Sequence, residues 1–267
     1  MAWIDALFSI GAVRKTAWRL WYPFLTRRVR GDDVIFLNYA FEDATEPLLE
    51  LGSDEEPNRA CIQLYHHVAS MGEIEGREVL EVSCGHGGGA AFVARHLRPS
   101  SYLGVDLNPA AIGFCGRRHS VPGLRFERAD AMRLPCRSES LDVVLNVEAS
   151  HCYPDFGRFL AEVRRVLKPG GELRYADFRF SDRFAEWDQA FENCGMERVS
   201  RREINAEVLR GMRRNSGRSL ELVRTRLPRF LHSLGEDFAG TEGSRIFRGL
   251  ETGEVSYRSY RLRKPLG

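Results

Sequence analysis

Long apolar runs, paired cysteines and a signal peptide are all missing from this sequence of 267 residues. No stretch of 18 apolar residues occurs, so no segment is predicted to span a membrane. The N-terminus lacks the basic region, apolar core and small-residue cleavage site of a secretory signal. The six cysteines are scattered without a C-x-x-C pair, which indicates reduced thiols and neither a disulfide framework nor a zinc site. We therefore expect a cytoplasmic protein without a bound metal.

A strong charge of either sign is also lacking. The formal net charge is +2, which by itself neither favours nor excludes a nucleic-acid partner. However, there is no basic tail or lysine run, and only three of the 39 basic side chains are lysine, so we expect no nucleic-acid partner. No internal repeat or low-complexity tract interrupts the chain. Its length suffices for one large domain with a substantial core.

The most informative stretch is 79–91, VLEVSCGHGGGAA. Its first residues form a short apolar run that is typical of a buried parallel strand. A glycine-rich turn follows and leads directly into a helix. Glycine allows a tight turn and a close approach of the backbone to a ligand, and amide groups at a helix start are hydrogen-bond donors. We expect Ser83, Gly85 and Gly87 to pass close to a nucleotide-like ligand at the edge of a doubly wound sheet.

Acidic residues near the ends of three successive predicted strands indicate which nucleotide-like ligand binds there. Glu81 lies inside the first strand, Asp106 and Leu107 end the second, and Asp130 and Ala131 close the third. The glycine pattern alone fits a dinucleotide as well as a methyl donor. Three acids suit S-adenosylmethionine (SAM), which is cationic, whereas they would repel a pyrophosphate. We expect Asp106 to bind the ribose, Asp130 and Ala131 to bind the adenine, and Glu81 and Leu107 to contribute to the same site.

Strands and helices alternate regularly after residue 79, which predicts a mostly parallel α/β sheet with right-handed crossovers. We expect a Rossmann-like sheet of seven strands. The predicted helices include 59–71, 109–118 and 156–168, and the predicted later strands are 124–130, 141–147, 172–178, 196–204 and a final edge strand near 255–262.

The domain organisation follows from this alternation. Residues 1–58 are expected to form an aromatic and basic arm followed by an irregular connection, and 59–267 the α/β domain, with a helical insertion at about 205–235 on the acceptor side. Residues 1–30 combine aromatic and basic side chains, so this arm could lie on a membrane surface, close over a pocket as a lid, or simply pack on the core.

The loop after the fourth strand is the expected place for catalysis, because ligands in such sheets bind beyond the carboxyl ends of the strands. His151 lies in this loop and is the candidate general base. Asp177, at the end of the next strand, could fix the tautomer of that imidazole. Asn146 and Glu148 could hold the methionine portion of the donor, and Tyr65 could reach the same portion from the helix at 59–71.

Several of these segments also resemble a known family. VLEVSCGHGGGA, LNVEASHCYPDFGRFLAEVRRVLKPGG, INAEVLRGMRRNS, DEEPNRACIQLYH and WRLWYPFLTR are similar to the mycobacterial phthiotriol/phenolphthiotriol dimycocerosate methyltransferases. The resemblance extends from about residue 15 to the end and is closest over 79–90 and 142–171. It implies a class I SAM-dependent O-methyltransferase fold with helical cap elements. Related sugar methyltransferases use a histidine base and an aspartate at the positions that match His151 and Asp177.

The resemblance implies methylation of a hydroxyl on a lipid or polyketide-derived acceptor, with SAM as donor and S-adenosylhomocysteine as product. Fatty acids, glycolipid sugars and other natural products are alternative acceptors, because the wider group includes enzymes for these. An NAD-dependent oxidoreductase and a catalytically silent subunit that binds a partner are the alternative classes of function.

Overall fold

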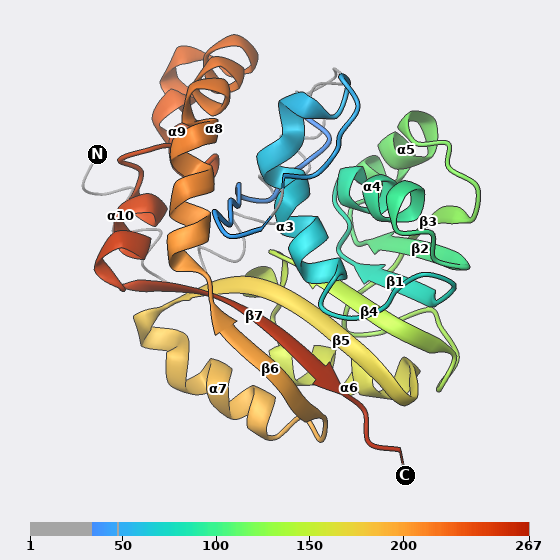
Figure 1. The fold of residues 1–267 in the computed structure, drawn as a ribbon. Helices are drawn as coiled ribbons and strands as arrows, with labels where there is room; N and C mark the ends of the chain where they lie inside the picture. Colours follow the sequence, from blue (N-terminus) through green and yellow to red (C-terminus); the bar gives the residue numbers. More distant parts are fainter. Residues whose placement is uncertain (1–33, 47, 267) are drawn as a thin grey trace.

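The computed structural model describes residues 34–46 and 48–266, and the predicted arm at 1–30 lies outside this part. Seven strands form one sheet in the order β3-β2-β1-β4-β5-β7-β6 (Figure 1). The strands are β1 (Glu78–Val82), β2 (Ser101–Asp106), β3 (Leu124–Arg128), β4 (Leu141–Val147), β5 (Leu167–Phe180), β6 (Glu197–Glu203) and β7 (Val255–Arg263). The predicted α/β fold with seven strands is confirmed.

Helices and short 3-10 turns connect these strands. The α-helices are α3 (Arg59–Ala69), α4 (Gly88–His96), α5 (Pro109–Arg118), α6 (Phe156–Val166), α7 (Phe184–Glu192), α8 (Asn205–Arg226), α9 (His232–Phe238) and α10 (Arg245–Thr252). The 3-10 turns are η1 (Glu56–Asn58), η2 (Ser150–Cys152), η3 (Ser181–Arg183) and η4 (Arg229–Leu231). The helical segment predicted at about 205–235 thus consists of α8, η4 and the start of α9. The division at residue 58 stays a prediction.

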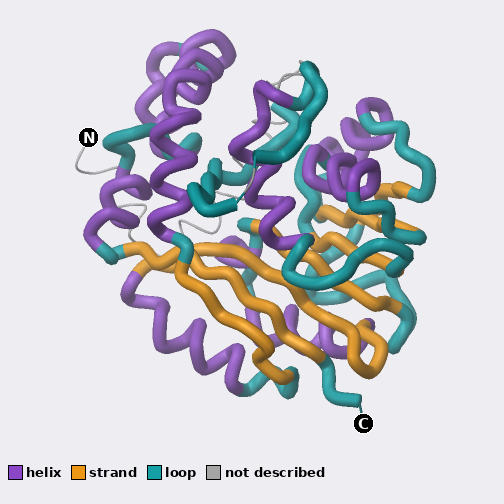
Figure 2. Tube along the Cα trace, in the orientation of Figure 1, coloured by secondary structure: helices purple, strands orange, loops and turns teal. Residues whose placement is uncertain are grey.

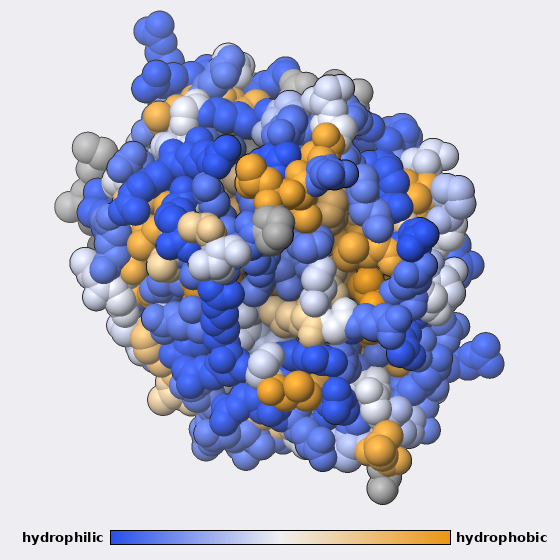
Figure 3. Space-filling model, viewed as in Figure 1, coloured by the Kyte–Doolittle hydropathy of each residue, from blue (hydrophilic) through white to orange (hydrophobic). Residues whose placement is uncertain are grey.

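The helices cover the sheet from two sides (Figures 1 and 2). Residues of α3, α4, α8 and α10 share one apolar core with one face of the sheet, for example Ile62, Phe92, Val208 and Phe247. Residues of α6 and α7 form a second core on the opposite face. The face seen in Figure 3 is mostly hydrophilic, with apolar residues in separate small groups. Burial of one apolar stripe per helix therefore explains the layered arrangement.

The position of β7 corrects the sequence-based expectation. β1 to β5 run parallel, whereas β7 is antiparallel to both β5 and β6. The final strand was expected at the edge of the sheet, but it lies between β5 and β6. Most residues of β7 are buried, while every residue of β6 is exposed. The charged sequence ERVSRRE suits an edge strand, because charged side chains discourage further strand pairing.

Several boundaries also differ from the expected ones: β5 extends over Leu167–Phe180 where 172–178 was expected, and β6 is one residue shorter at each end. α3 ends at Ala69, β3 ends at Arg128, and α6 ends at Val166, before the Pro-Gly-Gly sequence that was expected to end it. In the last case, Leu167 already pairs with Leu141 of β4, and a register shift follows. Pairing with β4 therefore ends the helix at Val166, before the Pro-Gly-Gly sequence is reached.

The glycine turn between β1 and α4 is packed tightly against other parts of the protein. Gly87 has a φ of 75°, which a side chain would strain. A Cβ at Gly89 would lie 1.9 Å from the ring of Tyr65 on α3. Gly88 donates its N–H to the carbonyl of Ile35 at 3.1 Å. The glycines are therefore needed for contacts within the protein as well as for access to a ligand.

We expect Gly89→Ala to destabilise the protein, because the added methyl group must displace the Tyr65 ring. Overpacking of this kind costs about 1–3 kcal/mol of the free energy of unfolding. Gly116→Ala in α5 is the matched control: its Cβ would meet no atom within 4 Å, so helix propensity should stabilise it by roughly 0.5–1 kcal/mol. Urea unfolding measures both changes, and equal effects of the two substitutions would contradict this description of the turn.

Candidate active site

A histidine and an aspartate form the most highly organised pair at the carboxyl end of the sheet. His151 lies in η2, directly after β4, and its Nδ1 is 2.9 Å from Oδ1 of Asp177 on β5. Asp177 Oδ2 accepts a second hydrogen bond from the backbone N–H of His151, also at 2.9 Å. The predicted proximity of these two residues is confirmed. Because Asp177 engages Nδ1, Nε2 is the ring nitrogen that remains available to a ligand, with the Cys152 side chain beside the imidazole.

The Asp177 carboxylate is fully buried and has several donors around it. Ser150 Oγ donates to it at 2.7 Å, the N–H of Phe178 donates at 2.8 Å, and Arg179 forms an ion pair with it at 3.2 Å. Burial alone would raise the pKa of Asp177, but the charges of His151 and Arg179 and these hydrogen bonds hold it well below its ordinary range. Asp177 is therefore a permanent anion beneath the imidazole.

The same pair sets the pKa of His151. Burial lowers this pKa, but the neighbouring Cys152 and Asp177, together with the hydrogen bond to Asp177, more than offset the effect of burial, and the pKa rises to about 10. The ring also lies against Phe178, with ring centroids 4.5 Å apart. The imidazole is thus strongly basic and fixed in one orientation.

A cavity of about 1110 Å³ lies in front of this pair. His151 and Phe178 line it, together with Phe156 and Trp187 from the α6–α7 side and Phe238 from the end of α9. This volume is sufficient for a large acceptor, and the lining combines aromatic and aliphatic side chains with many polar and charged ones.

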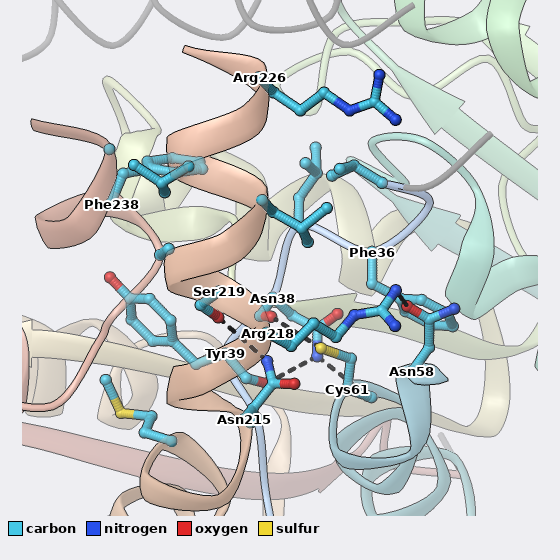
Figure 4. A pocket seen from close by; sticks show the side chains of 18 of the residues that line it. Phe36, Asn38, Tyr39, Asn58, Cys61, Asn215, Arg218, Ser219, Arg226 and Phe238 are labelled. Carbon is cyan, nitrogen blue, oxygen red and sulfur yellow. Dashed lines mark hydrogen bonds between the residues drawn. The ribbon is translucent and has the colours of Figure 1, made fainter. Parts of the chain in front are cut away.

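A second cavity, of about 120 Å³, lies between segment 34–40, α3 and α8 (Figure 4). Asn38, Asn215 and Ser219 lie close together on one side of it, and Phe238 lies on another. Leu37, Tyr39 and Phe238 line both cavities. Segment 34–40 therefore separates the two spaces.

The predicted ribose-binding acid lies at the end of β2 and holds the glycine turn. Asp106 Oδ2 accepts from the N–H of Gly85 at 3.0 Å, and Oδ1 accepts from the N–H of Asn108 at 2.8 Å. Burial raises the pKa of Asp106. Leu107, the next residue, is 47% exposed, which leaves an apolar surface beside the carboxylate.

Tyr65 and Glu81 meet each other, but in the interior. Oε1 of Glu81 accepts from the Tyr65 hydroxyl at 2.9 Å, and Oε2 accepts from the Tyr102 hydroxyl at 2.7 Å. Burial raises the pKa of Glu81 to about 7, although both hydrogen bonds lower it in part. Since Glu81 is only 1% exposed, this geometry favours a role in holding α3 against β1 and β2 over the expected contact with the donor.

Ser83 and Asn146 are joined through Tyr153, which no sequence pattern indicated. The Tyr153 hydroxyl lies 2.7 Å from Ser83 Oγ and accepts from Asn146 Nδ2 at 2.9 Å. Asn146 Nδ2 also donates to the carbonyl of Val82, while its buried Oδ1 has no hydrogen-bond partner among the described residues. A buried acceptor without a partner is unfavourable, so Asn146 Oδ1 is suited to a ligand that donates a hydrogen bond.

Glu148 follows β4 in a left-handed conformation, with a φ of 51°. Its Oε2 accepts from the N–H of Tyr39 and from the Tyr257 hydroxyl, both at 2.8 Å. Burial raises the pKa of Glu148 to about 8. Glu148 lines the large cavity near His151, so it ties segment 34–40 and β7 to the wall of the candidate site.

Asp130 and Ala131 lie in a turn beyond β3. Oδ1 of Asp130 accepts from the N–H of Met132 at 2.9 Å, and Asp130 is exposed, whereas Ala131 is buried. The structure therefore places Asp130 at the surface of the carboxyl edge of the sheet, just beyond β3, the strand next to β2.

Sequence reasoning missed three residues around the site: Leu37, Tyr39 and Tyr153. A Cβ at Gly85 would lie 3.1 Å from Leu37 Cδ1, so Leu37 covers the glycine turn. For Leu37 and Tyr39, the available signal was an apolar and aromatic segment, VIFLNYAF, within an otherwise acidic connection.

No group of three or more His, Cys, Asp or Glu side chains suited to a metal occurs in 34–46 and 48–266. No helix in these ranges is long and apolar enough to cross a membrane.

Comparison with known proteins bears on the activity. A family model for a methyltransferase domain matches residues 80–175. The phthiotriol/phenolphthiotriol dimycocerosates methyltransferase of Mycobacterium leprae is 52% identical over 250 residues, which cover 94% of this chain and 93% of the relative. The fatty-acid O-methyltransferase of Mycolicibacterium smegmatis is 43% identical over 255 residues, covering 95% and 92%.

Solved structures support the fold. The crystal structure of the cyclase SpnF matches with a TM-score of 0.69 at 18% identity, covering 93% of this chain and 95% of SpnF. At this identity the likeness concerns the fold alone, so the activity rests on the sequence relatives. These relatives also decide between the methyl donor and the dinucleotide that the glycine pattern left open. The chain is a methyltransferase and belongs to the phthiotriol/phenolphthiotriol dimycocerosates methyltransferase family.

Proposed function

We propose that the protein methylates a hydroxyl group of a lipid or polyketide-derived acceptor of the phthiotriol dimycocerosate type, with SAM as the donor and His151 as the general base. The single observation that carries this proposal is the pair formed by His151 and the buried Asp177 at the wall of a cavity of about 1110 Å³. The name of the Mycobacterium leprae relative supports the class of acceptor.

The residues present fit SAM, because groups that accept hydrogen bonds are gathered at the edge formed by β1, β2 and β4. We assign Asp106 to the ribose and the exposed Leu107 and Asp130, with Ala131, to the adenine side. Asn146 Oδ1 lacks a partner among the described residues and suits an amino group. The proposed SAM site is bordered by Ser83, Gly85, Gly87 and Glu148. It is supported from the protein interior by the hydrogen-bonded pair Tyr65 and Glu81. SAM, when bound, supplies an electrophilic methyl group on a sulfonium.

The chain's own contribution to the chemistry is the handling of a proton. An alcohol that becomes an ether loses its hydroxyl proton as the O–C bond forms and the C–S bond breaks. His151 Nδ1 is engaged by Asp177, so Nε2 takes this proton, and the Asp177 carboxylate stabilises the resulting imidazolium. With a pKa of about 10, His151 is protonated at neutral pH before the substrates bind. The positive charge of the SAM sulfonium would lower this pKa, so His151 would lose that proton more readily when SAM is bound.

A fatty-acid carboxyl group is the second candidate acceptor, supported by the Mycolicibacterium smegmatis relative. A carboxylate is already deprotonated at neutral pH, so it needs no general base. The His151–Asp177 pair therefore favours a hydroxyl acceptor over a carboxylate.

We expect His151→Ala to lower kcat by about 10²-fold or more at saturating SAM, since a positioned general base contributes roughly 10²–10⁴-fold. The control is His96→Gln, because His96 lies on α4 and pairs with Glu55 away from the cavity. Initial rates with labelled SAM and a long-chain alcohol measure both. A loss under threefold for His151→Ala would remove this residue from the mechanism.

The pH dependence of kcat/KM should follow the protonation of His151. Only the neutral imidazole accepts a proton, so the rate should rise with pH, with a midpoint above the reference value of about 6.5, because the folded protein raises this pKa to about 10. Asp177→Asn removes the stabilising carboxylate, lowers the pKa of His151 and should move the midpoint to lower pH. An unchanged midpoint in Asp177→Asn would contradict the proposed coupling.

Binding of SAM should depend on Asp106. Asp106→Asn removes a charge-assisted hydrogen bond, which contributes about 1.5–3 kcal/mol, so the dissociation constant for SAM should rise by roughly tenfold or more. Asp54→Asn, an exposed acid near η1, serves as the control. Isothermal titration calorimetry measures both, and equal affinities of the two variants would exclude Asp106 from the donor site.

A further inference from the structure

The cavity that contains His151 reaches the surface beside an exposed aromatic side chain. Phe230 of η4 is 83% exposed and at the same time lines this cavity. Single exposed apolar residues are common on protein surfaces and by themselves indicate little. Phe230 is different because it lies where the space for the acceptor opens.

Exposed arginines lie beside the same opening. Arg245 and Arg248, at the start of α10, are exposed and line the cavity, and Arg229 is exposed next to Phe230. None of the three forms an ion pair with a carboxylate of the described residues, although Arg248 donates to the carbonyl of Gly243. The Arg245 guanidinium lies 5.2 Å from the centroid of the Phe180 ring. We call Arg229, Phe230, Arg245 and Arg248 the cavity rim.

Acidic groups near the cavity rim offset this charge only in part, because Asp237 contributes one carboxylate against three arginines. Glu186 is paired with Arg183, at 2.7 Å. Asp237 accepts from the backbone N–H of Arg245, at 2.9 Å, which also fixes the end of α9 against the start of α10. The rim therefore keeps an excess of positive charge around an exposed aromatic side chain.

We propose that the cavity rim docks on an anionic lipid bilayer surface, from which a lipid acceptor enters the cavity. Aromatic side chains insert at the level of the lipid headgroups, and arginines are attracted by anionic lipids. The role in acceptor loading rests on the proposed function, whereas the docking itself does not. A bilayer fits because it presents negative charge and apolar material together, and the rim combines arginines with an exposed aromatic side chain at the entrance of the cavity.

The test is co-sedimentation of the full chain with vesicles, without SAM or acceptor. We expect stronger binding to equimolar phosphatidylcholine and phosphatidylglycerol than to phosphatidylcholine alone. Arg245→Gln combined with Arg248→Gln should weaken the partition coefficient by about tenfold or more, because each basic residue near such a surface contributes roughly fivefold. Phe230→Ser should weaken it several-fold.

Matched controls come from exposed residues elsewhere on the molecule. Arg125→Gln combined with Arg137→Gln removes two exposed arginines from β3 and a following loop, and β3 and α10 lie at opposite sides of the molecule in Figure 1. Leu266→Ser removes an apolar side chain that is 81% exposed. Circular dichroism verifies that each variant is folded.

The proposal is overturned if the rim variants bind like these controls, or if the unsubstituted protein binds neutral and anionic vesicles equally or binds neither. Because the assay contains no methyl donor, failure of the proposed methyl transfer would leave its outcome unchanged.

Discussion

A fully buried carboxylate at the end of β5 is the constraint on which the candidate site depends. Asp177 would be costly to bury as an isolated ion, and its position is stable because Ser150, His151 and Phe178 donate hydrogen bonds to it and Arg179 pairs with it. The turn after β4 must therefore close over β5 to supply these donors. The same closure brings the imidazole to the wall of the cavity, so the interactions that stabilise the loop also position the proposed base.

The opposite side of the site depends on packing around the glycine turn. Asp106 holds the turn from β2, Leu37 covers it, and Tyr65 fills the space left by Gly89. Glu81 fixes Tyr65 and thereby α3. The proposed donor site is thus shaped by contacts between segments that are far apart in the sequence. The two acids differ in position, because Asp106 lies at the edge of the sheet, whereas Glu81 lies in the interior.

Much of this architecture could be predicted from the sequence, since apolar runs and helical periodicity mark most strands and helices, and the His151–Asp177 contact follows from neighbouring parallel strands. The features that could not be predicted depend on contacts between residues that are far apart in the sequence. The interior position of β7 is decided by pairing with β5 and β6. The burial of Glu81 depends on Tyr65 and Tyr102, which lie on other elements. Leu37 and Tyr39 belong to an irregular segment without periodicity, so no pattern indicated their place at the site.

The most direct test of the central claim is kcat for the double variant His151→Ala/Asp177→Asn beside the two single variants. If Asp177 acts through His151, the effects of residues in one unit are not additive, and the double variant should lose about as much activity as His151→Ala alone. A loss equal to the product of the two single effects would show that the residues act independently, and would contradict the assignment of Asp177 as the residue that positions the base.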